Sequence, residues 1–339
     1  MKVLVIGCGR MGIRHCLGAM KVSRVDKIMV VDINEAALKN ASEQLSLKEE
    51  FYKFSFYLMD DYFKLNDCPD IVIIASTAGS RIDTCESIIK LNPRYILIEK
   101  PLGQSFDQVN ELVVYFEKHK QIKAFVNLNT RLYPAYNKLK NDLNSFPQFN
   151  GKKIISINTG TVGIGANGIH YIDLLKYLLD ADKVELVTGE IDEEIIPSGR
   201  GSAFCDFGGW AVIDYKNNSN EILGRAHLLL GSQSTALGPW EIVGTNGRIL
   251  IDEFEQTRFN KLRKPESDLP IQRYAGDYMP ITSEEFLIPF LNDLTFMWLE
   301  ELLNGNYILP ELKESLKVHE VLFNWLALSK THKKNYPIT

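Results

Sequence analysis

Short apolar runs alternate with amphipathic segments along the first third of the chain. The apolar runs are rich in Val, Ile and Leu and occupy residues 2–6, 27–31, 54–58, 70–75, 94–98 and 123–127. Segments between them carry apolar side chains at spacings of three and four, at residues 35–45, 82–91 and 106–116. Such alternation predicts βαβ units and a parallel sheet covered on both faces. We therefore expect residues 1–127 to form a doubly wound α/β domain.

The pattern changes after residue 127. Helical spacing is found at residues 135–143 and 168–179. Alternating runs occupy residues 151–159, 184–191, 210–214, 222–230, 241–244 and 248–251. Turn clusters at residues 217–220 and 245–247 are typical of antiparallel hairpins. Residues 128–339 are therefore expected to form an α+β domain with a mainly antiparallel sheet.

The end of the chain is less regular. Residues 254–278 have no clear period, and we expect a surface excursion or lid there. Two helices are predicted at residues 289–304 and 311–329, the first of them ending at Gly305.

Composition limits the classes of partner. The chain has 339 residues, of which 45% are hydrophobic and 24% charged, as in an ordinary globular protein. A net charge of −5 gives no reason to expect nucleic acid or an anionic membrane as a partner. The apolar runs are too short to span a bilayer. The five cysteines form no Cys-x-x-Cys pair, so we expect no metal site, no disulfide framework and a reducing cytoplasm.

A glycine-rich turn follows the first predicted strand. Gly7-Cys8-Gly9-Arg10-Met11-Gly12 fits G-x-G-x-x-G and opens a helical segment. In this context the first glycine permits a tight turn, the second lets the backbone approach a pyrophosphate, and the third lets helix and strand pack closely. The phosphate binds the free amides of the helix N-terminus. A plain strand-turn-helix is the alternative.

Asp32 ends the second predicted strand, twenty positions after Gly12. A carboxylate there binds the adenosine ribose hydroxyls and repels a 2′-phosphate, so NAD is preferred over NADP. The alternative, which is compatible with the first, is that Asp32 or Asn34 caps the next helix. Ser76 and Thr77 follow the fourth predicted strand, and they are expected at the same edge of the sheet.

Two further segments carry groups suited to catalysis. Lys100, in Glu99-Lys100-Pro101, follows the fifth predicted strand, where its charge can stabilise negative charge on an oxygen. His170 and Asp173 lie three residues apart on one helix face, so His170 can take a hydroxyl proton while Asp173 orients the ring. The alternatives are a solvated lysine and a surface histidine paired with a carboxylate.

The motifs occur together in a family-like order. Gly7-x-Gly9-x-x-Gly12 with His15, Glu99-Lys100-Pro101 and Gly168-Ile169-His170-x-x-Asp173 resemble the glucose–fructose oxidoreductase, inositol dehydrogenase and MocA (Gfo/Idh/MocA) family. Segments 129–134, 245–249 and 318–320 are also similar, so the resemblance spans nearly the whole chain. It implies a Rossmann domain and an α+β domain whose large open sheet mediates dimer or tetramer formation. The final helices are expected to pack on the first domain.

The resemblance also implies roles for individual residues. Lys100 would contact the substrate hydroxyl and the nicotinamide ribose, and His170 would be the acid/base. The implied cofactor-binding residues are Gly7, Gly9, Arg10, Met11, Gly12, Asp32, Ser76, Thr77, Glu99 and Lys100. Asn129, Arg131 and Asn167 are candidate substrate contacts; an inter-domain ion pair is the alternative for Arg131. Relatives often carry an aspartate at the position of Ala166, so inositol-type recognition is not implied.

These residues predict an NAD-dependent dehydrogenase acting on a secondary alcohol of a sugar, sugar derivative or polyol. One alternative is a hydrolase or eliminase that keeps NAD bound and oxidises its substrate transiently. The other is a non-catalytic NAD-sensing protein, against which Lys100 and His170 argue.

Overall fold

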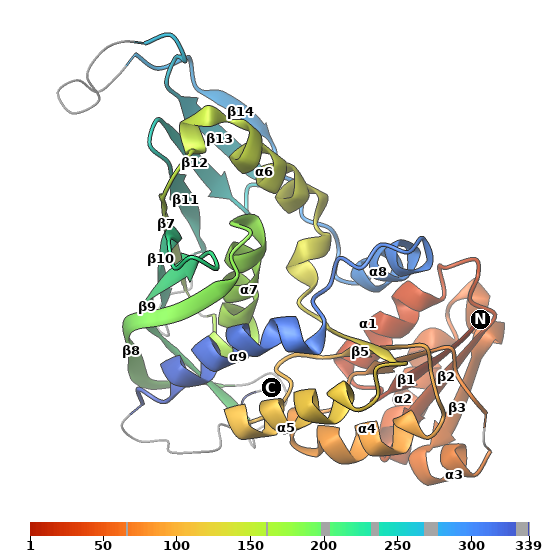
Figure 1. Cartoon of the computed structure of the whole chain (residues 1–339). Helices are drawn as coiled ribbons and strands as arrows, with labels where there is room; N and C mark the ends of the chain where they lie inside the picture. The colour runs from red at the N-terminus through yellow and green to blue at the C-terminus, as the bar shows by residue number, and fades with distance from the viewer. Residues whose placement is uncertain are drawn as a thin grey trace. The chain divides into compact units, whose positions relative to one another are not determined.

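The structure is a computed structural model that describes residues 1–65, 67–160, 162–197, 204–231, 237–267, 277–329 and 338. The chain divides into two compact units. The first consists of Met1–Leu132 and Pro289–Leu316, and the second of Tyr133–Ile288 and Lys317–Thr339. Each unit contains one sheet (Figure 1).

The sheet of the first unit has six parallel strands in the order β3-β2-β1-β4-β5-β6. Their bounds are β1 Lys2–Ile6, β2 Lys27–Asp32, β3 Phe54–Leu58, β4 Ile71–Ile74, β5 Tyr95–Ile98 and β6 Lys123–Val126. The middle strands are apolar on both faces because helices cover both faces. The chain reverses its direction of winding between β1 and β4, and the carboxyl ends of these strands are where such sheets bind ligands. The predicted doubly wound domain is confirmed.

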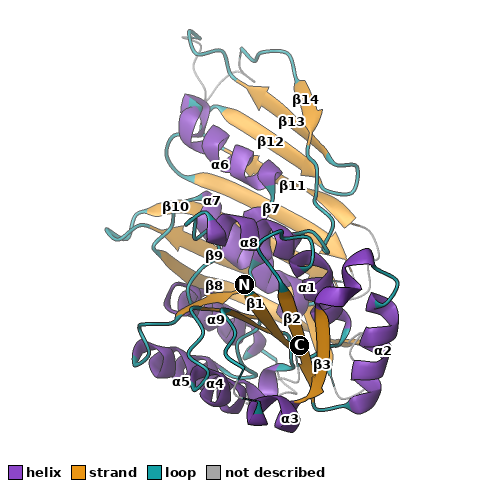
Figure 2. Ribbon diagram, turned by 90° about the vertical axis from the view of Figure 1, so that its right-hand side faces the viewer, coloured by secondary structure: helices purple, strands orange, loops and turns teal. Residues whose placement is uncertain are grey.

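Helices connect these strands and cover the sheet (Figure 2). They are α1 Arg10–Ala19, α2 Glu35–Leu45, α3 Met59–Lys64, α4 Arg81–Ile89 and α5 Phe106–Glu117, with short 3-10 turns η1 Glu49–Lys53, η2 Ala78–Ser80 and η3 Asn129–Leu132. Asn34 caps α2 by accepting from the amides of Ala36 and Ala37, as one of the two sequence alternatives predicted.

Helix α8, Leu294–Leu303, belongs to the first unit and packs on α1. Their close approach depends on Gly18, since a Cβ there would lie 2.7 Å from the Thr295 Cβ. The helix ends as predicted, because Gly305 adopts φ +85° beyond Asn304. Helix α9, Leu312–Leu326, begins in the first unit and continues into the second.

The second unit contains an eight-stranded sheet in the order β14-β13-β12-β11-β7-β10-β9-β8. The bounds are β7 Lys153–Gly160, β8 Lys183–Pro197, β9 Cys205–Lys216, β10 Ile222–Gly231, β11 Leu237–Val243, β12 Gly247–Asp252, β13 Thr257–Leu262 and β14 Thr282–Glu285. Only β7 and β10 pair in parallel among these neighbours of the described sheet. The predicted large, mainly antiparallel sheet is confirmed.

Helices α6, Pro134–Ser145, and α7, Ile169–Leu178, lie along the same face of this sheet (Figures 1 and 2). The 3-10 turn η4, Pro147–Phe149, follows α6, and the π-helical turn η5, Ile164–Gly168, precedes α7. Side chains on the sheet alternate between buried and exposed, and the exposed positions include Ile154, Trp210 and Leu229. One sheet face therefore carries apolar side chains that remain open to water.

The prediction of a surface excursion at residues 254–278 is wrong for its first part. Residues Thr257–Leu262 form β13, which pairs with β12 and β14, while residues 268–276 lie outside the described residues. The sequence pattern does not predict β13 because the buried positions of this strand are polar. Arg258 and Asn260 face inward, where Arg258 donates to Asp142 (2.6 Å) and Asn260 (2.8 Å). Alternation of apolar and polar residues is therefore inverted there.

Candidate functional site

The glycine turn has the geometry of a dinucleotide cradle. Gly7 adopts φ +88°, and a Cβ there would lie 2.7 Å from the Ser76 amide nitrogen. A Cβ on Gly12 would overlap the carbonyl oxygen of Gly7, so α1 can approach the turn only with glycine there. Above Gly9, by contrast, no atom lies within 4 Å of an added Cβ. The space left open at Gly9, at the N-terminus of α1, fits a pyrophosphate.

Asp32 ties this turn to the end of β2. One carboxylate oxygen accepts from the amide of Cys8 (2.8 Å) and the other from the amide of Asn34 (2.9 Å). Asp32 is therefore held at the edge of the cradle, where the ribose role was predicted. The next residue, Ile33, is 79% exposed although it is apolar. No sequence motif includes Ile33, but its exposure beside Asp32 makes it a candidate contact for the adenosine.

Ser76 and Thr77 follow β4 at the same edge of the sheet. The Ser76 hydroxyl is buried and has no hydrogen-bond partner among the described residues, whereas Thr77 is exposed. A buried hydroxyl without a partner is uncommon in a folded protein and fits a position completed by a ligand. The open cradle and the Ser76 hydroxyl are both consistent with a bound dinucleotide.

Glu99, at the end of β5, is 2% exposed and lies in a polar network. His15 Nε2 lies 3.0 Å from its Oε1, to which the Asn127 amide also donates (2.6 Å), and His15 Nδ1 lies 2.7 Å from the Thr295 hydroxyl. Burial by itself raises the pKa of Glu99, but His15, the charge of Lys100 and the Asn127 amide outweigh it and lower the pKa to about 2. Glu99 is thus ionised, and its side chain is held by the protein.

Lys100 is the next residue, and its backbone is anchored from one side. The buried guanidinium of Arg81 donates from Nη1 to the carbonyl oxygens of Glu99 and Pro101, and from Nη2 to that of Ser76 (3.1 Å). One side chain thus joins the loops after β4 and β5. Arg81 was not predicted as a site residue, since nothing in its spacing indicates contact with these carbonyls.

Asn129 and Arg131 lie on η3, directly after β6. Both are buried, and Arg131 donates to Glu314 at 2.8 Å. Both partners of this ion pair belong to the first unit, so it is not the inter-domain pair considered as an alternative. The substrate roles of Asn129 and Arg131 stay predictions.

His170 and Asp173 lie on α7 in the second unit. His170 is half-buried, whereas Asp173 is fully buried. Burial raises the pKa of Tyr215 well above its ordinary value, and the nearby charge of Asp173 adds to the effect. Asp173 therefore lies near β9 as well as on the helix of His170, and its role in orienting the histidine stays a prediction.

The turn before His170 is fixed by Asp206, another residue that the sequence analysis missed. Its carboxylate, on β9, accepts from the amides of Gly165 (2.9 Å) and Ala166 (2.7 Å). Gly163 gives it room, since a Cβ there would overlap the Asp206 carboxylate. Asn167, in the same turn, has an exposed side chain. Asp206 thus sets the course of the backbone that leads into α7.

An acidic group of the second unit also has an altered pKa. Burial raises the pKa of Glu253, in the turn between β12 and β13, to about 7. Burial also raises the pKa of Tyr133, to about 12, with the charge of Glu253 and then Tyr171 contributing. Glu253 therefore lies near Tyr133 and titrates close to neutral pH.

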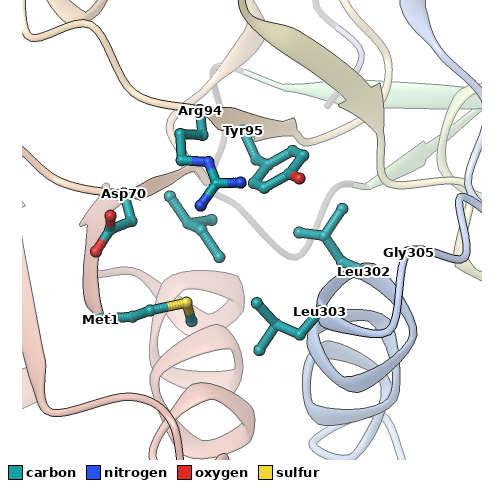
Figure 3. Close-up of a pocket in the computed structure, with 8 residues that line it drawn as sticks. Met1, Asp70, Arg94, Tyr95, Leu302, Leu303 and Gly305 are labelled. Carbon is teal, nitrogen blue, oxygen red and sulfur yellow. The ribbon is translucent and has the colours of Figure 1, made fainter.

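A cavity of about 180 Å³ lies at the opposite edge of the first sheet, lined by Met1, Asp70, Ile71, Arg94, Tyr95, Leu302, Leu303 and Gly305. Arg94 and Tyr95 precede and begin β5, and Arg94 extends toward Asp70 (Figure 3). The cavity is at the amino ends of the strands. It is therefore separate from the cradle, which lies at their carboxyl ends.

Within each unit, the predicted site residues lie on neighbouring elements. In the first unit, the glycine turn, Asp32, Ser76, Thr77 and Lys100 all lie at or just beyond the carboxyl ends of neighbouring strands. In the second unit, Asn167, His170 and Asp173 lie on η5 and α7, which are consecutive. Among the described residues, no helix is both long and apolar enough to cross a membrane.

Comparison with known proteins finds distant relatives in sequence and similar folds. The chain is 21% identical over 287 residues to myo-inositol 2-dehydrogenase of Thermotoga maritima, which covers 76% of this chain and 77% of that protein. Levoglucosan dehydrogenase, solved with NADH and levoglucosan, has a TM-score of 0.70 and 16% identity, with 97% of this chain and 96% of that chain covered. The transcriptional regulator Gal80p of Kluyveromyces lactis has a TM-score of 0.70 and 15% identity, with 97% and 89% covered.

These similar folds include dehydrogenases and a regulator, so the fold by itself does not decide the activity. The family profile GFO_IDH_MocA, described as an oxidoreductase family with an NAD-binding Rossmann fold, matches residues 1–128. Residues 1–128 therefore belong to the NAD-binding, Rossmann-fold oxidoreductase family Gfo/Idh/MocA, as the ordered motifs predicted.

Proposed function

We propose that this protein oxidises a secondary alcohol of a sugar, sugar derivative or polyol and uses NAD in preference to NADP. The observation that carries the proposal is the position of Lys100. It follows β5 at the carboxyl edge of the sheet that also forms the glycine cradle, and Arg81 and Glu99 anchor the chain around it. A cation held at that edge is suited to stabilising negative charge on a substrate oxygen.

The residues of the chain would divide the work as follows. The Lys100 ammonium donates a hydrogen bond to the substrate hydroxyl oxygen, and a His170 ring nitrogen accepts the hydroxyl proton. Asp173 orients His170, and Asn129, Arg131 and Asn167 contact other groups of the substrate. The glycine turn would hold NAD, which when bound would accept the hydride of the carbinol carbon. Gly7, Gly9, Arg10, Met11 and Gly12 would hold its pyrophosphate, Asp32 its ribose, and Ser76, Thr77 and Glu99 would line its site.

The names of two similar proteins support a hydroxyl-rich substrate. Myo-inositol is a cyclic polyol and levoglucosan is a sugar derivative, and both give their names to similar dehydrogenases. The chain has Ala166 where relatives often carry aspartate, and its amide is bonded to Asp206. We therefore propose the sugar and polyol class and no single member of it.

The test is a screen of sugars, sugar acids, inositols and nucleotide sugars with purified protein and NAD, followed by NADH absorbance. With a reactive substrate, Lys100→Ala and His170→Ala should each lower kcat at least roughly 100-fold. Lys100 supplies charge to the transition state and His170 supplies proton transfer. Unchanged turnover in either variant would show the assignment to be wrong. Substrate consumption without net NADH would instead identify a cycling hydrolase or eliminase. NAD binding without any turnover would identify a sensing protein.

We also propose that the protein is a cytoplasmic homodimer or homotetramer assembled through the open face of the second sheet. Four strands of this sheet each carry an apolar side chain that is more than a third exposed: Ile154, Trp210, Leu229 and Val243. Apolar side chains grouped in this way mark interaction surfaces. Leu229→Glu should lower the mass measured by light scattering, whereas Leu47→Glu, an exposed position after α2, should not. All five cysteines are among the described residues and none is in a disulfide, which fits the cytoplasm.

A further inference from the structure

Arg81 occupies an unusual place for a buried cation. It is the first residue of α4 and only 2% exposed. Positive charge at a helix N-terminus opposes the helix macrodipole, so the helix itself does not favour arginine there. Burying a guanidinium is also costly unless it is hydrogen-bonded. The contacts of the side chain must therefore account for its position.

Those contacts surround Lys100. Arg81 Nη1 donates to the carbonyl oxygens of Glu99 and Pro101, the residues on either side of Lys100. Nη2 donates to the carbonyl oxygen of Ser76, in the loop after β4 (3.1 Å). Rotation of the backbone at Lys100 would break at least one of these buried bonds. The loop that carries Ser76 is fixed by the same group.

We propose that Arg81 is a positioning residue, whose guanidinium fixes the backbone of Lys100 relative to the Ser76 loop after β4 so that the ammonium group meets the substrate hydroxyl. The inference rests on the proposed function, because it assumes that Lys100 acts on substrate. Arginine suits the task because its planar guanidinium presents several N–H donors in fixed directions. A lysine at the same position has a single ammonium group and a shorter reach, so it cannot reproduce all the contacts.

A double-mutant cycle with Lys100 tests the proposal, using a substrate found in the screen. Misplacing a catalytic group by about 1 Å costs roughly 100-fold in rate. Arg81→Ala should therefore lower kcat by about that factor, while the Kd for NAD, measured by calorimetry, changes less than about fivefold. In the Lys100→Ala background, Arg81→Ala should cost less than about threefold more, since no ammonium group remains to be positioned. A purely structural role would lower kcat equally in both backgrounds.

Added guanidinium gives a second readout. It should raise the kcat of Arg81→Ala at least tenfold by occupying the vacated site. Arg24→Ala is the control, because Arg24 is exposed and bonded to Leu303 and Glu300, and added guanidinium should not raise the kcat of that variant. Arg81→Lys retains a buried cation and serves for the cycle if the alanine variant does not fold. Hydrogen exchange of residues 97–104 should also be faster in either variant.

The inference is overturned if Arg81→Ala keeps wild-type kcat, or if its loss is as large without Lys100 as with it. Full turnover by Lys100→Ala alone is a different result. It would refute the proposed function, and the role of Arg81 with it.

Discussion

Two alanine substitutions in the glycine turn should separate cofactor binding from folding. Gly9→Ala introduces a Cβ into open space, because no atom lies within 4 Å of it, and its backbone (φ −66°, ψ −171°) is available to any residue. Gly12→Ala places the same Cβ 2.9 Å from the carbonyl carbon of Gly7 and in overlap with its oxygen. Carbon atoms in contact are normally about 3.5–4.0 Å apart. The turn must therefore open in Gly12→Ala and need not move in Gly9→Ala.

The expected magnitudes follow from these distances. Gly9→Ala should be as stable as the wild type or about 0.4–1 kcal/mol more stable, since alanine has fewer unfolded conformations. It should bind NAD roughly 10- to 100-fold more weakly, because the methyl group occupies the space through which the pyrophosphate reaches the amides, at a cost of about 1.5–3 kcal/mol. Gly12→Ala should lose about 1–3 kcal/mol of stability from overpacking and lose NAD affinity as well.

Calorimetry measures the NAD affinity, and hydrogen exchange at residues 2–20 measures the local stability of each variant. The two substitutions add the same atom three positions apart, so each is the control for the other. NAD affinity of Gly9→Ala within twofold of the wild type would refute the placement of the pyrophosphate. A Gly12→Ala variant as stable as Gly9→Ala would refute the packing argument.

Three further variants test other parts of the structure. Asp206→Asn should lower kcat about tenfold with little change in NAD affinity, because the turn before His170 loses a charge-assisted acceptor for two amides; unchanged kcat would contradict this. Between pH about 4.5 and about 7 the wild-type Glu253 carboxyl stays protonated in the folded protein but ionises in the unfolded chain, so the wild type loses stability as the pH rises. Glu253→Gln does not titrate, and in urea unfolding it should become more stable than the wild type over this range by up to roughly 3 kcal/mol. A pH-independent difference would show that the pKa of Glu253 is not raised in the folded protein. The double variant Asp32→Ser, Ile33→Arg should shift the ratio of the Kd values for NAD and NADP at least tenfold toward NADP. An unchanged ratio would contradict the binding of the ribose by Asp32.

The first unit could be predicted well from the sequence because its elements are locally determined. Buried strands are apolar on both faces, and glycine and asparagine mark the turns and caps at Gly7, Asn34 and Gly305. The strand β13 could not be predicted, because its inward positions hold Arg258 and Asn260, which bond to each other and to partners on other elements. A polar residue on a buried face is intelligible only once its partner is known.

The same limit applies to the candidate site. The motifs indicated Lys100 and His170, but not the groups that fix the chain around them. Arg81 acts on backbone carbonyls, which carry no sequence signature, and Asp206 reaches Gly165 from a strand 41 residues further along the chain. Glu99 was expected to line the cofactor site, yet its carboxylate is bonded to His15 and Asn127. The orientation of the Glu99 carboxylate depends on these two residues, which are distant in the sequence.

The central claim is direct removal of a hydride from a carbinol carbon, with the proton going to His170. It is tested most directly with a substrate from the screen that carries deuterium on that carbon. Mass spectrometry of the reduced cofactor should find one deuterium in each NADH, and His170→Ala should abolish the signal. Reduced cofactor without deuterium, or consumption of the substrate with no net reduced cofactor, would contradict the account.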